Sequence, residues 1–114
     1  MDCIFCSIIE GKIPSKKIFE SDNFLSFFDA NPVTPGHALV IPKRHYEIFL
    51  DMPSSLGIEC LDIINKTTLR ILKENNASGF KLVSNNKKIA GQVVPHLHFH
   101  IIPRKENDGI KHLV

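Results

Sequence analysis

Three histidines occupy every second position near the end of the chain, at His96, His98 and His100. Alternate side chains of a β-strand share a face and lie roughly 6.6 Å apart, so the spacing predicts three imidazoles on one face and a core face opposite. An unperturbed imidazole has a pKa of about 6.5 and is largely neutral at pH 7. Neutral imidazole can attack phosphorus or bind a metal ion, whereas a merely solvated strand face more often uses Lys, Thr or Glu.

Glycine and neutral hydrogen-bond donors precede this histidine row. Gly91 lets the backbone approach a ligand closely, and the successive amides that follow it could bind phosphate oxygens. The side chains of Asn85 and Gln92 offer neutral donors that can stabilise charge developing on phosphorus. Polar loops are common, so each residue is weak evidence alone, but together they favour phosphate chemistry.

The cysteines are three in number, and two of them form the sequence Cys3-x-x-Cys6. Without an export signal, disulfides are not expected to persist. The pair is therefore metal-binding, redox-active or simply buried. Cys60 stands in an apolar helical stretch, where a thiol packs as a small hydrophobic residue, and we expect it in the core.

Length and charge limit the classes of function. The 114 residues suggest a single domain over 1–114, and 14 basic against 12 acidic side chains are too balanced for strong electrostatic capture of nucleic acid. There is no apolar run long enough to span a membrane. The first residues lack the plan of a signal peptide, so we expect a cytoplasmic protein with neither a nucleic-acid nor a membrane partner.

The elements that must position these residues can be located from apolar periodicity and from Gly and Pro. We expect a short helix over Cys3–Glu10 and a main helix between Pro53 and Asn76, with a core face that includes Leu61 and Ile64. Strands are predicted at Lys17–Glu20, Phe24–Phe28, Ala38–Ile41, Phe80–Val83 and His96–Ile102. Hairpins and short loops join them, which predicts an α+β fold with an antiparallel sheet.

The whole pattern resembles the histidine triad superfamily, particularly the microbial members of its histidine triad nucleotide-binding (HINT-like) branch. The run from His96 to Ile102 fits the signature His-φ-His-φ-His-φ-φ, in which φ is apolar. Further matching segments follow in family order, namely Cys3–Cys6 with Ile13-Pro14, Phe28–Pro32, Pro35–His45 and Gly91-Gln92. Together these segments cover nearly the whole chain and are highly specific.

The resemblance implies a five-stranded antiparallel sheet, one main helix and a short N-terminal helix, in a homodimer whose sheets join into a ten-stranded layer. It implies a nucleotidyl hydrolase or transferase that acts at the α-phosphate of purine nucleoside phosphoramidates, or of related AMP or GMP esters. By matching position, His98 would be the nucleophile, His100 would hold the α-phosphate, His37 would lie near them and Asp29 would bind the ribose. The base pocket would consist of Phe5, Ile8, Ile13 and Phe27, and the phosphate contacts would come from Asn85, Gln92 and the Val93 amide.

A metal site beside the active site is also implied by the resemblance. In relatives that carry the cysteine pair, the remaining two ligands match His45 and His96, which gives a structural Cys₂His₂ zinc site with Cys3 and Cys6. Such a site would pin the N-terminal helix to the sheet. Two reduced cysteines packed near the surface are the alternative.

The sequence departs from the family pattern at two places. Val93 stands where many relatives have Ser or Thr, so the hydroxyl thought to assist the leaving group is missing, and Lys87-Lys88 occupies a loop that usually contains Gly.

Two other functions are compatible with the sequence. One is a nucleotide-binding sensor or scaffold with little turnover, in which His98 would be dispensable. The other is a zinc hydrolase that uses the three strand histidines, although a Cys₂His₂ site would leave no open position for metal-bound water.

Overall fold

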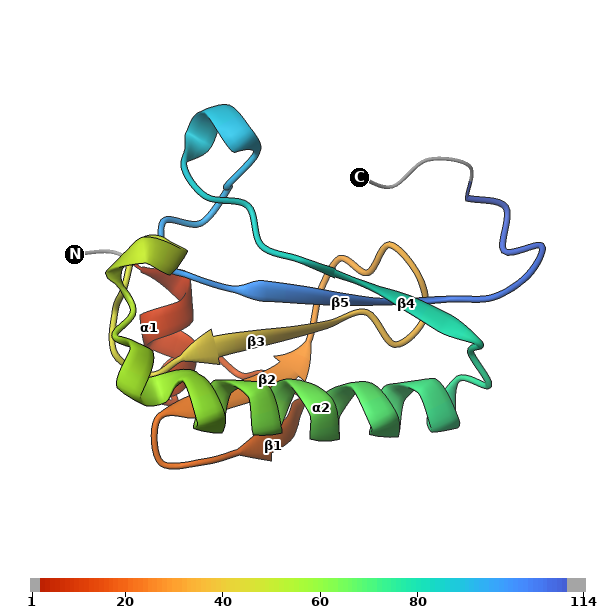
Figure 1. Ribbon diagram of the computed structural model, residues 1–114, viewed down its shortest axis with the longest axis horizontal. Helices are drawn as coiled ribbons and strands as arrows, with labels where there is room; N and C mark the ends of the chain where they lie inside the picture. The colour runs from red at the N-terminus through yellow and green to blue at the C-terminus, as the bar shows by residue number, and fades with distance from the viewer. Residues whose placement is uncertain (1–2, 111–114) are drawn as a thin grey trace.

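The computed structural model describes residues 3–110, and its centre is a five-stranded antiparallel sheet. The strands are β1 (Lys17–Glu20), β2 (Phe24–Phe28), β3 (Ala38–Pro42), β4 (Gly79–Val83) and β5 (Phe99–Arg104), arranged in the order β1-β2-β3-β5-β4. The main helix α2 (Gly57–Glu74) covers one face of the sheet, and the short helix α1 (Ile4–Ile9) lies on the opposite side at one end (Figure 1). Three short 3-10 turns, η1 (Phe49–Asp51), η2 (Ser54–Leu56) and η3 (Lys88–Ala90), lie in the connections. This architecture confirms the predicted fold class.

Alternation along the strands divides the apolar residues into two clusters. On the α2 side, Leu97, Phe99 and Ile101 pack with Ala38 and Val40 of β3. The cluster on the α1 side consists of Cys3, Phe5, Ile8, Leu25, Phe27, Leu39 and Ile41. His96, His98 and His100 therefore fall on the α1 side, as their spacing predicts.

The last strand begins at Phe99, three residues later than the sequence pattern predicts. Residues 96–98 are held by loops instead of neighbouring strands: the Leu97 amide donates to the Tyr46 carbonyl at 2.6 Å, and the His96 amide donates to Val94 at 2.8 Å. The alternation of faces continues through this irregular segment, because Leu97 is buried in the α2 cluster beside Phe99. The prediction of a regular strand from His96 was wrong, but the prediction of a shared face was correct.

Helix α2 differs from expectation in its buried face. Its buried residues are Cys60, Ile63, Ile64, Thr67, Thr68 and Ile71, which confirms the expected position of Cys60 in the core. Leu61 is 58% exposed, so the prediction that it belongs to the core face was wrong. The helix has a second apolar stripe, formed by Ile58, Leu61 and Leu69, that no described residue covers.

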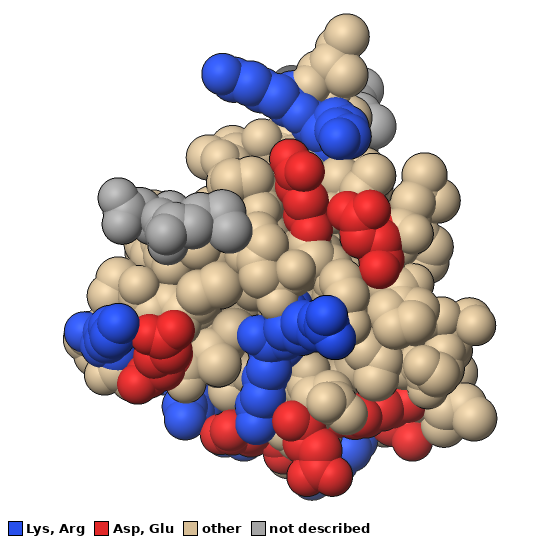
Figure 2. Space-filling model, turned by 90° about the vertical axis from the view of Figure 1, so that its left-hand side faces the viewer, with Lys and Arg blue, Asp and Glu red and all other residues tan. Residues whose placement is uncertain are grey.

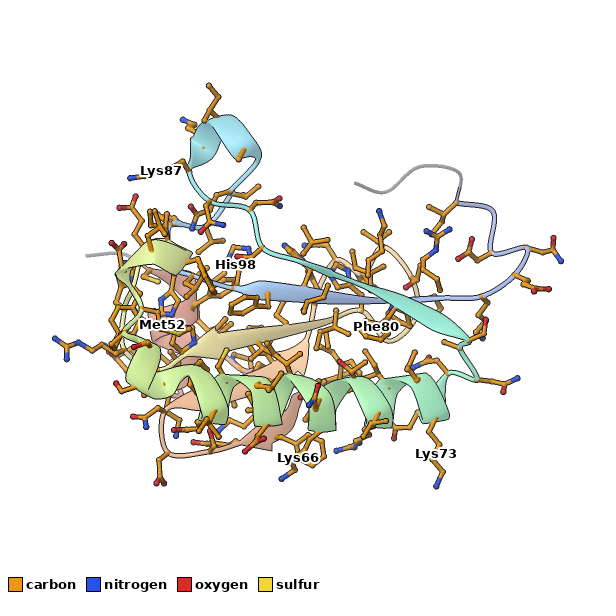
Figure 3. All side chains as sticks on the ribbon, viewed as in Figure 1. Met52, Lys66, Lys73, Phe80, Lys87 and His98 are labelled. Atoms are coloured by element: carbon orange, nitrogen blue, oxygen red, sulfur yellow. The ribbon has the colours of Figure 1, made fainter. Side chains whose placement is uncertain are left out.

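The outer surfaces carry scattered charge. Lys73 points from α2 away from the sheet (Figure 3), whereas the Lys66 ammonium lies over the ring of Phe19 in β1, 4.9 Å from its centroid. Acidic and basic side chains are interspersed on the face shown in Figure 2. Within the described residues there is no helix of the length and apolarity that crossing a membrane requires.

Candidate functional site

His98 is buried against a single backbone acceptor. Its Nδ1 lies 2.7 Å from the carbonyl oxygen of His96, and because a carbonyl can only accept, Nδ1 carries the proton in the neutral ring. The other nitrogen, Nε2, is therefore left with a lone pair. Burial also lowers the pKa of His98 below its ordinary value, which favours the neutral ring at pH 7. Neutral imidazole with a free Nε2 lone pair is the form that can act as a nucleophile.

His100 and His37 form a chain of hydrogen bonds that begins at the backbone. The Val33 amide donates to His37 Nδ1 at 3.1 Å, so the proton of neutral His37 is on Nε2. That nitrogen lies 3.0 Å from His100 Nδ1 and 3.5 Å from Asp29 Oδ2. With His100 Nδ1 accepting, the proton of His100 is on Nε2. Burial, followed by the charges of His98 and His37, lowers the pKa of His100 to about 4, so this ring is neutral.

A pocket of about 1160 Å³ opens on this side of the sheet. One part is apolar, with the Phe5 and Phe27 rings packed edge to face at 5.8 Å between centroids. Asp29 lies with the histidines in another part, and its Oδ1 accepts from the Asn31 amide at 2.8 Å. The pocket lining contains nine of the predicted site residues, namely Phe5, Ile8, Ile13, Phe27, Asp29, His37, Val93, His98 and His100.

Two predicted phosphate contacts lie elsewhere. The Gln92 side chain is buried and uses both of its polar atoms within the protein: Nε2 donates to the Glu47 carbonyl at 2.7 Å, and Oε1 accepts from the Lys87 amide at 2.7 Å. Asn85 does not line the pocket, although its side chain packs beside Gly91, which does. The structure thus gives Gln92 a role in fixing the loop, and phosphate contact by either side chain stays a prediction.

Lys87 stands at a strained position in the same loop. Its φ of 76° and ψ of 154° fall in a region that is almost restricted to glycine. The conformation is imposed from both sides, because the Lys87 amide donates to Gln92 while the Lys87 carbonyl accepts from Ala90 and Gln92. Sequence reasoning noted the missing glycine, and the structure shows that the backbone retains the shape that glycine favours.

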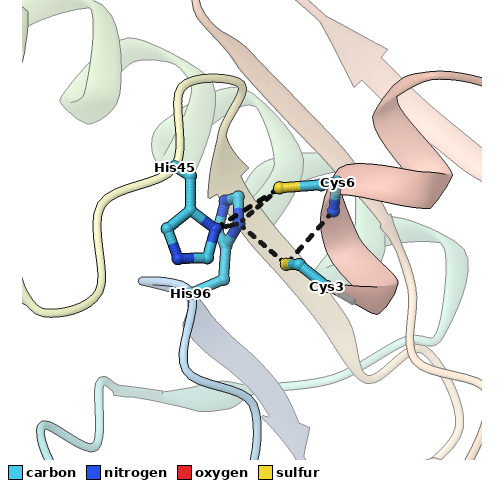
Figure 4. A group of neighbouring side chains, drawn as sticks. All are labelled: Cys3, Cys6, His45 and His96. Atoms are coloured by element: carbon cyan, nitrogen blue, oxygen red, sulfur yellow. Dashed lines mark hydrogen bonds between the residues drawn. The ribbon is translucent and has the colours of Figure 1, made fainter. Parts of the chain in front are cut away.

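A second group of side chains lies on the other side of His96. Cys3 Sγ is 3.3 Å from His96 Nδ1, Cys6 Sγ is 3.3 Å from His45 Nδ1, and the two Nδ1 atoms are 3.2 Å apart (Figure 4). His96 Nε2 donates to the Pro42 carbonyl at 2.8 Å, so its Nδ1 presents a lone pair to the other three side chains. We call these four residues the Cys/His cluster.

The spacing of these donor atoms fits a tetrahedral ion. Zinc–ligand bonds of about 2.3 Å to sulfur and 2.0 Å to nitrogen separate tetrahedral ligands by roughly 3.3 Å for N–N and roughly 3.5 Å for S–N. The observed N–N distance is 3.2 Å and the S–N distances are 3.3–3.6 Å. Burial raises the pKa of the Cys6 thiol to about 11 and lowers that of His96 to about 4, so both of these side chains are neutral at pH 7. The donor set suits a divalent cation.

The three histidines of the row do not converge on one point. His96 belongs to the Cys/His cluster. His100 lies with Asp29 and His37, the only other group among residues 3–110 whose ligand atoms are close enough together to hold a metal ion. In that second group donors and acceptors already alternate from the Val33 amide to His100. This separation argues against a hydrolytic metal held by all three strand histidines.

Comparison with known proteins agrees with this geometry. A model of the HIT domain matches residues 10–107. The chain belongs to the HIT family. An uncharacterised HIT-like protein of Methanocaldococcus jannaschii is 49% identical over 94% of this chain and 82% of its own length. An adenosine 5′-monophosphoramidase of Candida albicans is 42% identical over 91% of this chain and 71% of its own length.

Solved structures give the same result for the fold. The crystal structure of a HIT family member from Bacillus subtilis superposes with a TM-score of 0.92 and 40% identity, covering all of this chain and 82% of that chain. Some members of the family are thus named as nucleotide hydrolases, and the fold of this HIT protein is the same as that of its relatives.

The loop that delivers His37 to the site of this HIT protein depends on Gly36. This residue has a φ of +89°, and a Cβ there would lie 2.2 Å from Asn75 Nδ2 at the end of α2. We predict that Gly36→Ala lowers the free energy of unfolding by more than about 1 kcal/mol, from backbone strain and this overlap. Urea unfolding measures the change.

The control is Gly57→Ala, because Gly57 has helical angles and open space around its Cα. We expect this substitution to leave stability unchanged or to raise it. Equal stability of the two variants would contradict the importance assigned to the Gly36 turn.

Proposed function

We propose that this HIT protein is a nucleotidyl hydrolase or transferase that acts at the α-phosphate of purine nucleoside phosphoramidates or related AMP and GMP esters. The observation that carries the proposal is the His98 Nδ1 bond to the His96 carbonyl, because it leaves Nε2 unprotonated in a nucleotide-sized pocket. The phosphoramidase name of the Candida relative supports the same class of substrate.

The proposed chemistry has two steps. In the first, His98 Nε2 forms a bond to the α-phosphorus, the bond from phosphorus to the leaving group breaks, and the leaving group takes a proton from water. In the second, water attacks the phosphorus of the nucleotidyl-histidine and the P–N bond breaks, which releases the nucleoside monophosphate and restores the neutral ring. The proton lost by the attacking water neutralises the hydroxide left by the first step. The His96 carbonyl accepts from Nδ1 throughout, so it stabilises the positive charge of the substituted imidazole.

The remaining residues bind and orient the substrate in this scheme. His100 donates from Nε2 to a phosphate oxygen, and His37 holds His100 in the tautomer that makes this donation possible. Asp29 accepts from the ribose hydroxyls, and the base lies in the apolar part of the pocket, whose lining includes Phe5 and Phe27. Val93 is 88% exposed, so water can reach the leaving-group side, where Val93 itself supplies no proton.

A covalent intermediate is the first prediction of this scheme. Rapid-quench mass spectrometry after mixing with adenosine 5′-phosphoramidate should detect a nucleotidyl adduct on His98. His98→Ala should lose the adduct and lower kcat on the order of 10³-fold or more, because the nucleophile is gone. Calorimetric binding of AMP to this variant is the control that its pocket remains intact.

A nucleotide sensor or scaffold would behave differently. It would bind AMP but form no adduct, and His98→Ala would retain whatever slow turnover the wild type has. That result would refute the catalytic proposal. A panel of adenosine and guanosine phosphoramidates, dinucleoside polyphosphates and adenylyl sulfate, assayed side by side, would then define the preferred base and leaving group of an active enzyme.

We also propose that the Cys/His cluster holds a structural zinc ion. Four protein ligands would close the tetrahedron, so zinc would tie α1 to the sheet without an open position for substrate. Elemental analysis of protein purified without chelator should give about one zinc per chain, and Cys3→Ser should lose the zinc and lower Tm. Cys60→Ala removes a thiol outside the cluster and should retain the metal. Metal-free wild-type protein would overturn this proposal.

A homodimer is the proposed assembly. Strand β4 is at an edge of the sheet, and Phe80 and Leu82 pair with Pro103 and Ile101, which places them on the α2 side. Each is 47% exposed. Together with the second stripe of α2 (Ile58, Leu61 and Leu69) they form an apolar surface suited to a second copy of the chain.

Sedimentation velocity tests this assembly. Wild-type protein should sediment as a dimer, and Leu61→Arg should shift it towards monomer by placing a charge in the buried interface. Ile89→Arg is the matched control, because Ile89 is 99% exposed in η3, at the tip of a loop far from α2 (Figure 1). A monomeric wild type, or a dimer that tolerates Leu61→Arg, would contradict the proposal.

A further inference from the structure

The Cys/His cluster and the active site share one residue. The His96 side chain is in the cluster through Nδ1, while the carbonyl oxygen of the same residue accepts from His98 Nδ1 at 2.7 Å. Its Nε2 is bonded to the Pro42 carbonyl at 2.8 Å, and the residue is fully buried. Whatever fixes the imidazole of His96 therefore also fixes the acceptor that sets the tautomer and orientation of His98.

Helix α1 connects the same two sites a second time. Cys3 caps the helix by accepting from the Cys6 amide at 3.3 Å, so both cluster cysteines are part of its first turn. Phe5 and Ile8 of the same helix line the pocket. A helix of six residues is too short to be stable alone, so its position depends on the groups that attach it to the sheet.

The Phe5 ring joins the connection through His96 to the connection through α1, because it belongs to α1 and contacts the His96 ring. Its centroid lies 5.1 Å from that of His98, 5.8 Å from that of His96 and 5.8 Å from that of Phe27, in edge-to-face arrangements. It therefore touches the proposed nucleophile, a cluster residue and a second apolar residue of the pocket lining. A shift of α1 would move one wall of the pocket and remove a neighbour that restrains the His98 ring.

We propose that Cys3, Cys6 and His45 are positioning residues for nucleotide binding and for His98, acting through His96 and α1. This inference rests on the proposed function, and it goes beyond a stabilising role for zinc. A cluster that only stabilised the fold would change Tm and leave the binding constant of the folded protein unaltered. A cluster that positions the site changes the affinity for nucleotide and the state of His98 in molecules that are still folded.

His45 is the residue best suited to the test, because it does not line the pocket and is not part of α1, although its Nδ1 lies 3.3 Å from Cys6 Sγ. His45→Ala removes one ligand, whereas His45→Cys replaces it with another and leaves a Cys₃His set that also binds zinc. Two properties are measured in protein shown to be folded by its amide NMR spectrum. They are the affinity for AMP by calorimetry and the ¹⁵N signals of the His98 ring, which report its tautomer without nucleotide.

The expected result separates the two variants. His45→Ala should weaken AMP binding by roughly tenfold or more and mix the tautomers of His98, while His45→Cys should keep both properties close to wild type. Folded His45→Ala with wild-type affinity and an unmixed His98 signal would overturn the inference. If His45→Ala does not fold, wild type with and without chelator gives the same two measurements.

The inference and the proposed function fail in different ways. Zinc-loaded wild type that does not bind AMP would refute the proposed function, and the His98 ring signals would still decide whether the cluster positions that residue. Phe5→Leu gives an independent check, because it keeps all four cluster residues. It should retain zinc yet mix the His98 tautomers, and an unmixed signal would exclude the route through Phe5.

Discussion

The alternation of side chains along residues 96–102 is the constraint on which both faces of the sheet depend. Leu97, Phe99 and Ile101 complete the core beneath α2, and the histidines between them are thereby directed to the opposite side, where α1 packs. A shift of one residue would bury three imidazoles under the helix and expose three large apolar groups. The core thus enforces the register of the chemistry, since the register that buries the apolar set is the one that directs His98 and His100 to the pocket and His96 to the Cys/His cluster.

Backbone groups then give identical side chains different properties. A carbonyl at Nδ1 leaves Nε2 of His98 unprotonated, and a carbonyl at Nε2 leaves Nδ1 of His96 unprotonated. For His37 the partner of Nδ1 is the Val33 amide, a donor, so Nδ1 is the unprotonated nitrogen, which is the reverse of the arrangement in His98. Because main-chain atoms do not titrate, these tautomers are set by the fold and persist as long as each ring stays hydrogen-bonded to its main-chain partner.

Much of this arrangement was predictable from local pattern, since the strands, α2 and the shared face of the histidines follow from periodicity. The contacts that complete the site were not, because they join residues distant in sequence. His37 meets His100 across 63 positions, and Gln92 turns inward to the Glu47 carbonyl instead of the pocket. Leu61 was misplaced for a different reason: an apolar stripe on a helix has the same spacing whether it meets the core or an exposed surface. The resemblance to histidine triad proteins nominated the Cys/His cluster, which the Cys pair alone left open.

The loop around Lys87 shows how hydrogen bonds to one buried side chain can hold a strained backbone next to the pocket. Its shape is imposed by hydrogen bonds between the backbone and Gln92, and not by the conformational freedom of the residue at position 87. Position 87 therefore carries a lysine side chain on a backbone conformation that favours glycine, and these hydrogen bonds offset the strain. Since this loop leads to the pocket-lining residues Gly91 and Val93, the buried Gln92 side chain fixes the backbone at the point where the pocket begins.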